Sequence, residues 1–472
     1  MVNENFDVVV IGAGPVGENA AARTAAGGLT TALVETELLG GECSYWACMP
    51  SKALLRPGHA LAAAKRVPGV PVGERLDAEA VLKRRDEFTS HWDDSGQVEW
   101  ARSAGITVVR GRGRITGERQ VTVAGADGAH RVLVARHAVV VCTGSVPKFP
   151  PLPGLDEVAV WTSREATSAE EVPRSLAILG GGVVGVEMAQ AWARLGSQVT
   201  LIVSRDRPLP KFEDFVGELV AEGLREDGVT IRLNAKAERV ADADGGVELT
   251  LAGGERIIAD HLLVATGRQP ATADIGVDAF GVEPGQPLSI DDSGLAPEVD
   301  GRWLYAAGDV TGRALLTHQG KYEARAVGDA ILARAAGRLK GDPEPWSSAA
   351  ATADHVAVPQ VVFTDPEVAF VGRTAEQARA AGLEVDVVDL DIAVAGSSLH
   401  ADGYRGKTRM VVDRRRRTVI GLTFVGQDVS EMLHAATIAV VGEVPVDRLW
   451  HAVPAFPTMN EVWLRLLEAY GL

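Results

Sequence analysis

The chain has 472 residues, of which 46% are hydrophobic, and its formal net charge at pH 7 is −16. This length exceeds what one hydrophobic core usually serves, so we expect about three domains. The negative charge argues against nucleic acid as a partner, because its phosphates would be repelled, and no apolar stretch is long enough to cross a bilayer.

The N-terminus reaches the first predicted strand without a basic region or a cleavage site, so we expect a cytoplasmic protein. The 3 cysteines are too few for a framework of structural disulfides. In a reducing compartment, a close cysteine pair is more typical of a catalytic or a metal-binding site.

The first predicted unit is an apolar, β-branched strand from Asp7, a glycine-rich turn, a helix over Glu18–Ala26 and a strand over Ala32–Glu35. Glycines allow a tight turn and let a pyrophosphate approach the helix N-terminus. Glu35 lies 23 residues after Gly12, where a carboxylate can accept hydrogen bonds from a ribose hydroxyl. The pattern therefore predicts a dinucleotide-binding fold. Its glycines are Gly12, Gly14 and Gly17.

Cys43 and Cys48 follow this unit in the stretch GGECSYWACMPSK. Two thiols at this spacing, close to a dinucleotide site, indicate a flavin that passes electrons to a disulfide. The alternative is a pair of buried, unreactive cysteines. A metal would need more ligands nearby, and none is evident around Cys43, so we expect no metal site.

A second unit of the same kind follows a break near Pro147–Pro153. Strand Ser175–Leu179 leads into a glycine turn, a helix that runs to Leu195 and a strand over Gln198–Val203. This repetition predicts a second dinucleotide-binding fold. Its glycines are Gly180, Gly182 and Gly185.

The tip of this second strand carries no acid. Val203 stands 23 residues after Gly180, where an acid would sit in an NAD-type site, and Ser204, Arg205 and Arg207 follow. A carboxylate would repel a 2′-phosphate, whereas arginine can pair with one in bidentate fashion. We therefore favour NADPH, with NADH possible. The alternative is that these arginines belong to a solvated loop.

Near the C-terminal end, the run Arg414–Arg417 separates two strand-like stretches, Thr408–Val412 and Val419–Phe424. This pattern predicts an exposed hairpin turn.

Taken together, these motifs resemble the class I FAD-dependent pyridine nucleotide–disulfide oxidoreductases, which include glutathione reductase, dihydrolipoamide dehydrogenase and mercuric reductase. The resemblance covers nearly the whole chain. It implies an α/β fold with two Rossmann-like dinucleotide-binding domains and an α+β C-terminal dimerisation domain. The motifs are the first glycine turn, the cysteine stretch through Lys52, Val141–Gly144, the second glycine turn with Glu187, Ala265–Arg268, Ala307–Val310 and Phe363–Val368.

The resemblance also implies the domain boundaries. Residues 1–150 form the FAD-binding domain, which the segment 273–345 completes, and residues 151–272 form the NAD(P)-binding domain. Residues 346–472 form the interface domain, and such a domain implies a homodimer.

By the same resemblance, Cys48 is the flavin-proximal thiolate and Cys43 is the interchange thiol that attacks the substrate. Lys52 lies near the flavin, where a cation favours the reduced ring, and pairs with Glu187, although a structural salt bridge between domains would look the same. Cofactor contacts are implied for FAD at Gly12, Gly14, Gly17, Glu35, Lys52, Thr143, Gly144, Asp309, Thr317 and His318, and for NADPH at Gly180, Gly182, Gly185, Ser204, Arg205, Arg207 and Gly267.

Some positions depart from the family pattern. Tyr45 and Trp46 stand between the cysteines, where the family usually has smaller residues, so they either reshape the approach to the disulfide or fill core. Val183 replaces a tyrosine that shields the flavin in glutathione-reductase-like proteins, which predicts a more open entry. We assign no chemistry to Cys142, which stands where the family often has alanine.

The largest departure is at the C-terminal motif His-Pro-Thr-x-x-Glu, where Phe456 replaces the histidine. In disulfide reductases the partner subunit supplies that histidine, the glutamate orients it, and it protonates the departing thiol, which is worth about 10²–10⁴-fold in rate. Glu461 remains as a carboxylate expected near the disulfide. His451 could reach the site by another path, although a lone histidine is more often structural.

We therefore expect an enzyme in which NADPH reduces FAD, and FAD reduces Cys43–Cys48, which passes electrons to a small-molecule acceptor that the sequence does not name. A disulfide with a good leaving thiol would need less protonation. One alternative is a reductase of quinones or metal ions, although the cysteine pair that mercuric reductase carries near its C-terminus is absent after Cys142. Another is a non-catalytic flavoprotein component of a larger complex.

Overall fold

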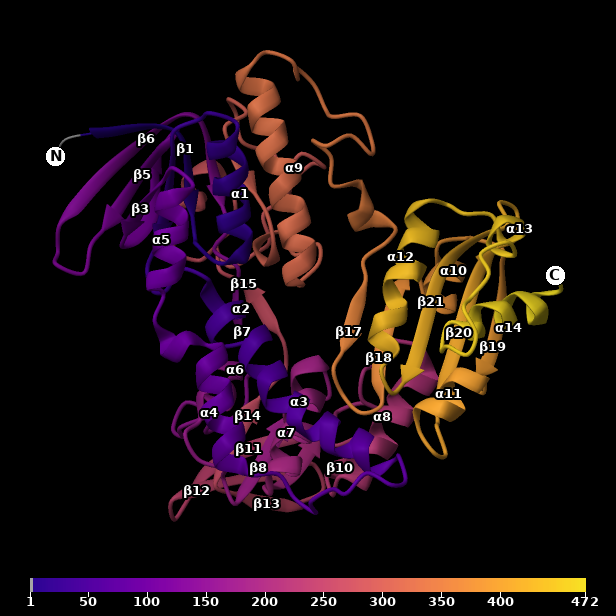
Figure 1. Cartoon of the computed structure of the whole chain (residues 1–472). Coiled ribbons are helices and arrows are strands. Elements are labelled where there is room, and N and C mark those ends of the chain that lie inside the picture. Colours follow the sequence, from indigo (N-terminus) through magenta and orange to yellow (C-terminus); the bar gives the residue numbers. More distant parts are fainter. Residues whose placement is uncertain (1–2) are drawn as a thin grey trace. The chain divides into compact units, whose positions relative to one another are not determined.

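The structure is a computed structural model that describes residues 3–472 (Figure 1). Its contacts group the chain into two compact units, and each is described by itself. The first unit takes the described chain up to Pro50 and the segments Asp86–Lys148 and Arg268–Asp354. The second takes Ser51–Arg85, Phe149–Gly267 and His355–Leu472.

The first unit is built on a seven-stranded sheet with the order β3-β2-β1-β6-β5-β4, in which β16 also pairs with β6. Strand β1 pairs in parallel with β2 and β6, and alternate residues enter two separate cores, Val9 on one face and Val10 on the other. Burial on both faces explains why this stretch is continuously apolar. The strands are β1 Asn3–Ile11, β2 Thr31–Glu35, β3 Ile106–Arg110, β4 Arg112–Gly117, β5 Gln120–Ala124, β6 His130–Val141 and β16 Leu304–Ala306, with the separate pair β7 Ser145–Pro147 and β15 Arg268–Pro270.

Helices α1 and α9 pack against one another beside this sheet (Figure 1). Helix α1 begins at Pro15, three residues before the predicted start at Glu18, because proline fits the first helical position and Gly14 is the N-cap. The helices of the unit are α1 Pro15–Ala26, α2 Gly41–Tyr45, α5 Ser95–Ser103 and α9 Thr317–Ala335, with short 3₁₀ turns at η1 Ser90–Trp92, η2 Val277–Phe280 and η3 Asp309–Thr311. The chain passes between the units within α3 Cys48–Lys65, α4 Ala78–Phe88 and the turn η4 Thr352–His355.

The second unit contains a parallel sheet with the order β10-β9-β8-β14. Helix α7 spans Val183–Leu195, so its predicted end at Leu195 is confirmed, and Gly196 caps it in the left-handed conformation that terminates helices. Strand β9 ends at Ile202, one residue before the predicted Val203. The elements are α6 Ser163–Ser168, β8 Ser175–Leu179, α7 Val183–Leu195, β9 Gln198–Ile202, α8 Asp214–Glu226, β10 Thr230–Arg232 and β14 His261–Val264, with the antiparallel sheet β11 Ala237–Ala243, β12 Gly246–Leu251 and β13 Arg256–Ala259.

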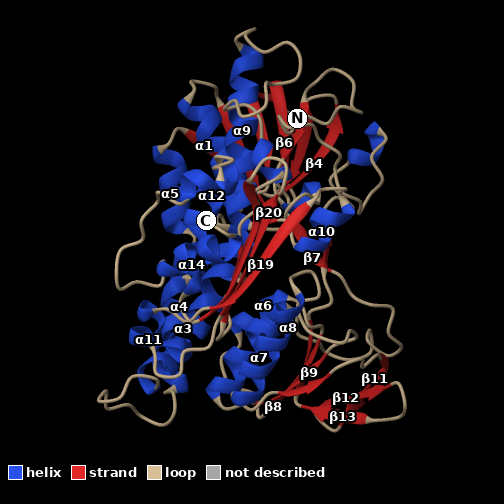
Figure 2. Cartoon of the chain, turned by 90° about the vertical axis from the view of Figure 1, so that its right-hand side faces the viewer, coloured by secondary structure: helices blue, strands red, loops and turns tan. Residues whose placement is uncertain are grey.

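The C-terminal part of this unit is a five-stranded antiparallel sheet, drawn in red in Figure 2, with the order β17-β18-β21-β20-β19. Helices α12 and α14 share one core with the sheet, and α10 packs on the opposite face. The predicted hairpin at Arg414–Arg417 is confirmed, since it joins the paired strands β20 and β21. The elements are β17 Gln360–Val362, β18 Glu367–Gly372, α10 Ala375–Ala380, β19 Val385–Asp391, α11 Ala395–His400, β20 Lys407–Asp413, β21 Thr418–Gly426, η5 Val429–Met432, α12 Leu433–Val441, α13 Val446–Leu449 and α14 Glu461–Tyr470.

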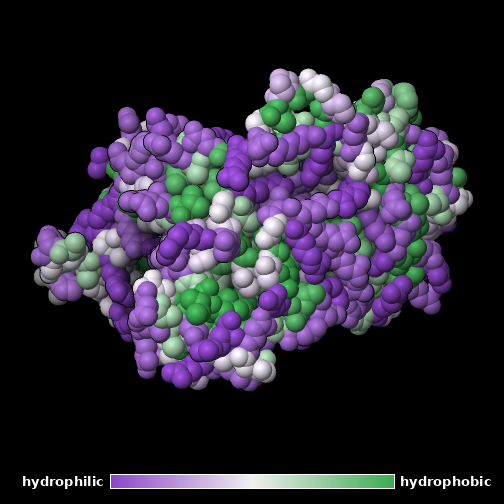
Figure 3. Space-filling model, turned by 90° about the horizontal axis from the view of Figure 1, so that it is seen from below, coloured by the Kyte–Doolittle hydropathy of each residue, from purple (hydrophilic) through white to green (hydrophobic). Residues whose placement is uncertain are grey.

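The face in Figure 3 is largely hydrophilic and is interrupted by separate apolar patches. None of the helices in the described part of the chain has the length and apolar character that a membrane crossing requires.

Candidate active site

The first glycine turn closes tightly on itself in the first unit. Gly12 has φ +97°, and a Cβ added there would lie 2.4 Å from the carbonyl oxygen of Cys142. A Cβ added at Gly17 would lie 1.8 Å from the carbonyl oxygen of Gly12, whereas one at Gly14 would meet no protein atom within 4 Å. No described side chain caps the first turn of α1. The turn therefore leaves an open face and unpaired N–H groups where a phosphate can bind.

Glu35 ends β2 beside this turn. Its Oε2 accepts a hydrogen bond from the backbone N–H of Ala13 at 2.7 Å, and its Oε1 accepts one from Glu37 at 2.8 Å. The acid thus occupies the strand tip that the sequence predicts and also holds the glycine turn in place.

The cysteine segment lies directly against the same turn. Gly41 opens α2, and a Cβ added there would lie 2.8 Å from the Cα of Gly14. Cys43 lies within α2 and Cys48 opens α3, and both are partly buried. The fold therefore brings the start of helix α2, which carries Cys43, into contact with the first glycine turn.

Cys48 has a hydroxyl neighbour from a distant part of the chain. Its Sγ lies 3.2 Å from Oγ1 of Thr317, which is the first residue of α9. A hydroxyl at this distance can donate a hydrogen bond to a thiolate. His318, the next residue, has an exposed side chain.

Tyr45 is a core residue. Its side chain is buried, its ring lies 5.7 Å from that of Trp46, and burial raises the pKa of its hydroxyl to about 12. Trp92 Nε1 donates to the carbonyl oxygen of Tyr45 at 3.2 Å. These contacts favour the interpretation that Tyr45 fills core, while Trp46 is only partly buried.

Asp309 lies in a partly buried polar cluster that the sequence predicts only in part. Ser145 Oγ donates to Asp309 Oδ2 at 2.5 Å, and Arg268 donates to Ser145 Oγ at 2.7 Å and to its carbonyl oxygen at 2.6 Å. Burial raises the pKa of Asp309, although the Ser145 hydrogen bond and the Arg268 charge oppose the rise. Position was the only available signal, since Ser145 follows Gly144 and Arg268 ends a family motif.

Thr143 and Gly144, two residues predicted to contact FAD, differ in their surroundings. Thr143 Oγ1 donates to the carbonyl oxygen of Ala271 at 2.8 Å. Gly144 has φ +72°, and a Cβ there would meet nothing within 4 Å, so this face is open to a ligand. Cys142 is buried and burial raises its pKa, so it stays a neutral thiol, which fits the lack of chemistry assigned to it.

In the second unit, Lys52 and Glu187 form a direct ion pair. Lys52 Nζ lies 2.7 Å from Oε2 of Glu187, and Oε1 of Glu187 accepts a hydrogen bond from the backbone N–H of Phe363 at 2.9 Å. Nζ also lies 5.0 Å from the centroid of the Phe363 ring. The Glu187 side chain is only 4% exposed, so both of its oxygens are satisfied in a buried position.

The second glycine turn repeats the first. Gly180 has φ +122°, and a Cβ there would lie 2.4 Å from the carbonyl oxygen of Ala265. A Cβ at Gly185 would lie 1.9 Å from the carbonyl oxygen of Gly180, whereas Gly182 is open. Gly267 has φ +139° and is open as well. Val183, the first residue of α7, is partly buried.

In the loop after β9, the two predicted arginines, Arg205 and Arg207, have different surroundings. Arg207 is held by Asp206 at 3.0 Å and by Asp214, so its guanidinium already has two carboxylate partners. Arg205 is exposed and, within residues 3–472, its side chain makes no hydrogen bond or ion pair. Val203 is buried and Ser204 is exposed. Of the two arginines predicted to bind a 2′-phosphate, Arg205 is therefore the better candidate.

At the C-terminal motif, Phe456 is 75% exposed and the neighbouring Val453 is 86% exposed. Glu461 opens α14, and its Oε1 accepts a hydrogen bond from Arg465 at 2.7 Å. Its Oε2 is buried and has no hydrogen-bond partner in the described part of the chain. His451 is exposed.

Comparison with known proteins places this geometry in a family. Residues 6–353 match the model of the pyridine nucleotide-disulphide oxidoreductases, and residues 358–466 match the dimerisation domain of the same family. The chain is 35% identical over 464 residues to a dihydrolipoyl dehydrogenase of Chlorobaculum tepidum, covering 97% of this chain and 95% of that protein. It is 30% identical over 470 residues to a leghemoglobin reductase of Vigna unguiculata, covering 97% and 86%.

Solved structures of two proteins have the same fold as this chain. The HOCl-induced flavoprotein disulfide reductase RclA of Escherichia coli, in its Cu(II) complex, has a TM-score of 0.83 at 26% identity, covering 98% of this chain and 99% of that chain. The fold of LpdA from Mycobacterium tuberculosis matches with a TM-score of 0.83 over 100% of both chains. The predicted resemblance and fold class are confirmed, and the chain belongs to the pyridine nucleotide–disulfide oxidoreductases, enzymes that use FAD and NAD(P)H.

Proposed function

We propose that this enzyme passes electrons from NADPH, through bound FAD, to a Cys43–Cys48 disulfide and from there to a small-molecule acceptor. One observation carries the proposal: helix α2, which carries Cys43, begins in contact with the first glycine turn. A Cβ added at Gly41 would lie 2.8 Å from the Cα of Gly14. FAD, when bound, supplies two-electron transfer between the nicotinamide and the disulfide.

In this proposal, Cys48 is the sulfur nearer the flavin and Cys43 attacks the acceptor. Reduction of the disulfide adds two electrons and one proton and breaks the S–S bond, leaving a thiolate and a thiol. Thr317 Oγ1, 3.2 Å from Cys48 Sγ, is placed to donate a hydrogen bond once Cys48 is a thiolate. Attack by Cys43 on a disulfide acceptor forms a mixed disulfide and releases the first thiol. Attack by Cys48 on the Cys43 sulfur then releases the second thiol and re-forms the Cys43–Cys48 disulfide.

Lys52 supplies a positive charge and Glu187 fixes its position. Support comes from the 2.7 Å ion pair and from the Phe363 N–H, which holds the second Glu187 oxygen. A fixed cation favours the electron-rich reduced ring of the flavin.

The preference for NADPH is part of the same proposal. Support comes from Val203, a buried apolar residue at the strand tip, and from Arg205, whose guanidinium is exposed for a 2′-phosphate. Asp206 stands next to Arg205 and opposes this preference by its charge, so NADH remains a testable second donor.

We infer that the acceptor is a disulfide whose leaving thiol has a low pKa. Phe456 supplies no proton, and a thiol of low pKa leaves without one. Phe456→His is expected to raise turnover of ordinary aliphatic disulfides. No gain would mean that another residue, such as Glu461 or His451, already supplies the proton, or that disulfides are not the substrate.

The dimerisation domain of the family supports a homodimer. The exposed apolar side chains of Val453 and Phe456 suit burial against a second copy. The boundaries at residues 150, 272 and 345 and the cytoplasmic location stay predictions.

A reductase of metal ions or quinones is the second candidate. It is favoured by Phe456, since such an acceptor has no leaving thiol to protonate, and by the likeness to the E. coli flavoprotein that was solved with Cu(II). The metal ion would then be the substrate.

Replacing both Cys43 and Cys48 by serine separates the two candidates. Disulfide turnover is expected to vanish, while reduction of the flavin by NADPH continues. If turnover of quinone or Cu(II) survives in the same variant at the wild-type rate, the flavin serves that acceptor directly and the disulfide proposal does not describe it.

A further inference from the structure

Helix α7 presents three polar side chains along one face, at Glu187, Gln190 and Arg194. All three bind the segment 363–365, which joins β17 to β18. The Phe363 N–H donates to Glu187, and Arg194 Nη2 donates to Oδ2 of Asp365 at 2.8 Å. Gln190 binds the backbone of Asp365 in both directions, accepting from its N–H at 2.7 Å and donating to its carbonyl oxygen at 2.9 Å.

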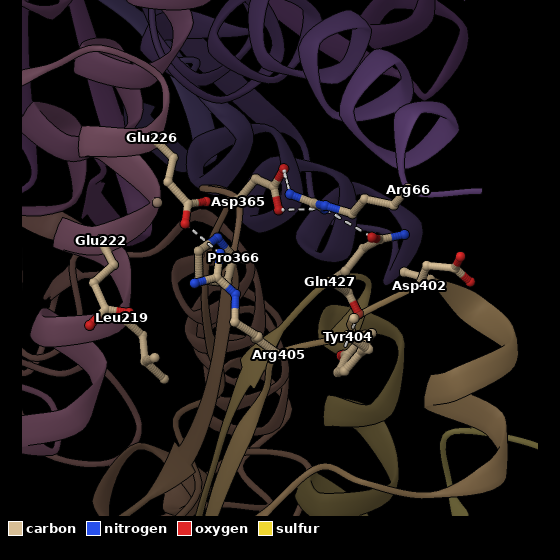
Figure 4. A pocket seen from close by; sticks show the side chains of 13 residues that line it. Arg66, Leu219, Glu222, Glu226, Asp365, Pro366, Asp402, Tyr404, Arg405 and Gln427 are labelled. Carbon is tan, nitrogen blue, oxygen red and sulfur yellow. Dashed lines mark hydrogen bonds and ion pairs between the residues drawn. The ribbon is translucent and has the colours of Figure 1, made fainter. Parts of the chain in front are cut away.

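Asp365 is the centre of this contact. Its side chain is 8% exposed and also accepts two hydrogen bonds from Arg66, at 3.0 and 2.8 Å, while Arg66 donates to Gln427 at 2.9 Å (Figure 4). Burial alone would raise the pKa of Asp365, but the hydrogen bonds and charges of Arg66 and Arg194 hold it below its ordinary value. Asp365 is therefore a carboxylate held between two guanidiniums.

The segment has no room to shift. A Cβ added at Gly223 of α8 would lie 2.4 Å from the carbonyl oxygen of Asp365. Asp227 accepts hydrogen bonds from Gln190 at 2.7 Å and from Arg194 at 2.9 Å, which fixes the two side chains that hold Asp365. Close packing and the hydrogen bonds to the carboxylate and backbone of Asp365 together define one position for the segment.

Phe363 connects this position to the ion pair. Its N–H binds Glu187, and its ring lies 5.0 Å from Lys52 Nζ. A shift of the segment would thus remove one hydrogen bond from a buried carboxylate and move the aromatic face beside the ammonium group.

We propose that Gln190, Arg194 and Asp365 are positioning residues for the Lys52–Glu187 pair. They act on the pair through the Phe363 N–H, which binds Glu187. The inference rests on the proposed role of that pair beside the flavin, and it adds the buried network that keeps the pair in one geometry.

The test compares Gln190→Ala with Arg405→Ala in the FAD-loaded enzyme. Arg405 and Asp365 both line a cavity of about 200 Å³, where Arg405 pairs with Glu226 at 2.5 Å (Figure 4). Within residues 3–472, Arg405 makes no hydrogen bond to the segment 363–365. Hydrogen exchange of the amides at 363–365 and the flavin midpoint potential are measured for both variants. If Gln190→Ala does not fold, Gln190→Met fills a similar volume without the amide and takes its place.

We expect exchange at 363–365 to become about tenfold faster in Gln190→Ala, because a buried hydrogen-bonded contact is lost, and to stay unchanged in Arg405→Ala. The midpoint potential should shift in Gln190→Ala and in Glu187→Gln, and the double variant should shift no further than Glu187→Gln alone. Additive shifts, or a wild-type potential in Gln190→Ala, would overturn the inference while leaving the Lys52–Glu187 role intact. A wild-type potential in Glu187→Gln would overturn that role, and the inference with it.

Discussion

The two glycine turns have nearly the same backbone but different strand tips. An added Cβ would fall 1.8 Å from a carbonyl oxygen at Gly17 and 1.9 Å at Gly185, so both turns exclude any side chain there. After the first turn, Glu35 binds back to the turn, whereas Val203 is a buried apolar residue after the second. In the proposed function, both turns therefore bind a dinucleotide, and the residue at the end of the following strand selects which dinucleotide binds.

The helices that follow the two turns are also anchored differently. Arg23 of α1 pairs with Asp329 at 2.5 Å, but its side chain is 50% exposed. Arg194 of α7 pairs with Asp365 at 2.8 Å, with side chains 11% and 8% exposed. One ion pair lies at the surface and the other is buried, so removing one partner should destabilise the protein more at the buried pair.

The largest effects are expected from the glycines. Gly17→Ala should abolish FAD binding, because the new methyl group collides with backbone, and the purified protein should be colourless. Gly185→Ala should keep the flavin and lose tight binding of the nicotinamide dinucleotide. Absorbance of the purified protein and dinucleotide titration measure both.

The open glycines provide the matched controls. A Cβ at Gly14 or Gly182 meets no protein atom within 4 Å, so each alanine variant should unfold at the wild-type temperature. Each should nevertheless weaken its own dinucleotide, because the methyl group would stand where the phosphates approach. Wild-type affinity in both controls would contradict this placement of the phosphates.

The buried and exposed ion pairs should differ in stability. Arg194→Ala is expected to lower the free energy of unfolding by about 3 kcal/mol, because it leaves a buried carboxylate short of a partner. Arg23→Ala should cost less than about 1 kcal/mol, since water replaces the partner. Chemical denaturation measures the free energy of unfolding of both variants, and equal losses would contradict the expected difference between the two ion pairs.

The charge of Asp365 should appear in the pH dependence of stability. Because its pKa is lower in the folded chain than in the unfolded chain, its contribution is present above the unfolded pKa and is lost as the pH falls through the folded pKa. The stability difference between wild type and Asp365→Asn should be constant near neutral pH and shrink in acid. A difference that grows in acid would contradict the ion pairing.

A smaller effect is expected at the tip of the second strand. Arg205→Ala should lower kcat/KM for NADPH about tenfold and leave the value for NADH unchanged, because only NADPH carries the 2′-phosphate. Arg207→Ala should change the ratio less, since Asp206 and Asp214 already hold that guanidinium. Steady-state rates with both donors decide the matter, and an outright preference for NADH would refute the choice of NADPH.

Much of the fold was predictable, because glycine turns and apolar strands leave local patterns in the sequence. Gly12, Glu35 and Gly185 follow from spacing alone, and the pairing of Lys52 with Glu187 follows from the family resemblance. The contact of Cys48 with Thr317 could not be predicted from local patterns, since 269 positions separate the two residues. The network around Asp365 was hidden for the same reason, because only tertiary packing brings Arg66, α7 and the segment 363–365 together.

An anaerobic titration of the FAD-loaded enzyme with NADPH tests the central claim most directly. If Cys43 and Cys48 are coupled to the flavin, the first equivalent of NADPH should produce a long-wavelength absorbance band from the Cys48 thiolate beside the oxidised flavin. Direct bleaching of the flavin without that band would contradict the claim and leave the cysteines outside the path of the electrons.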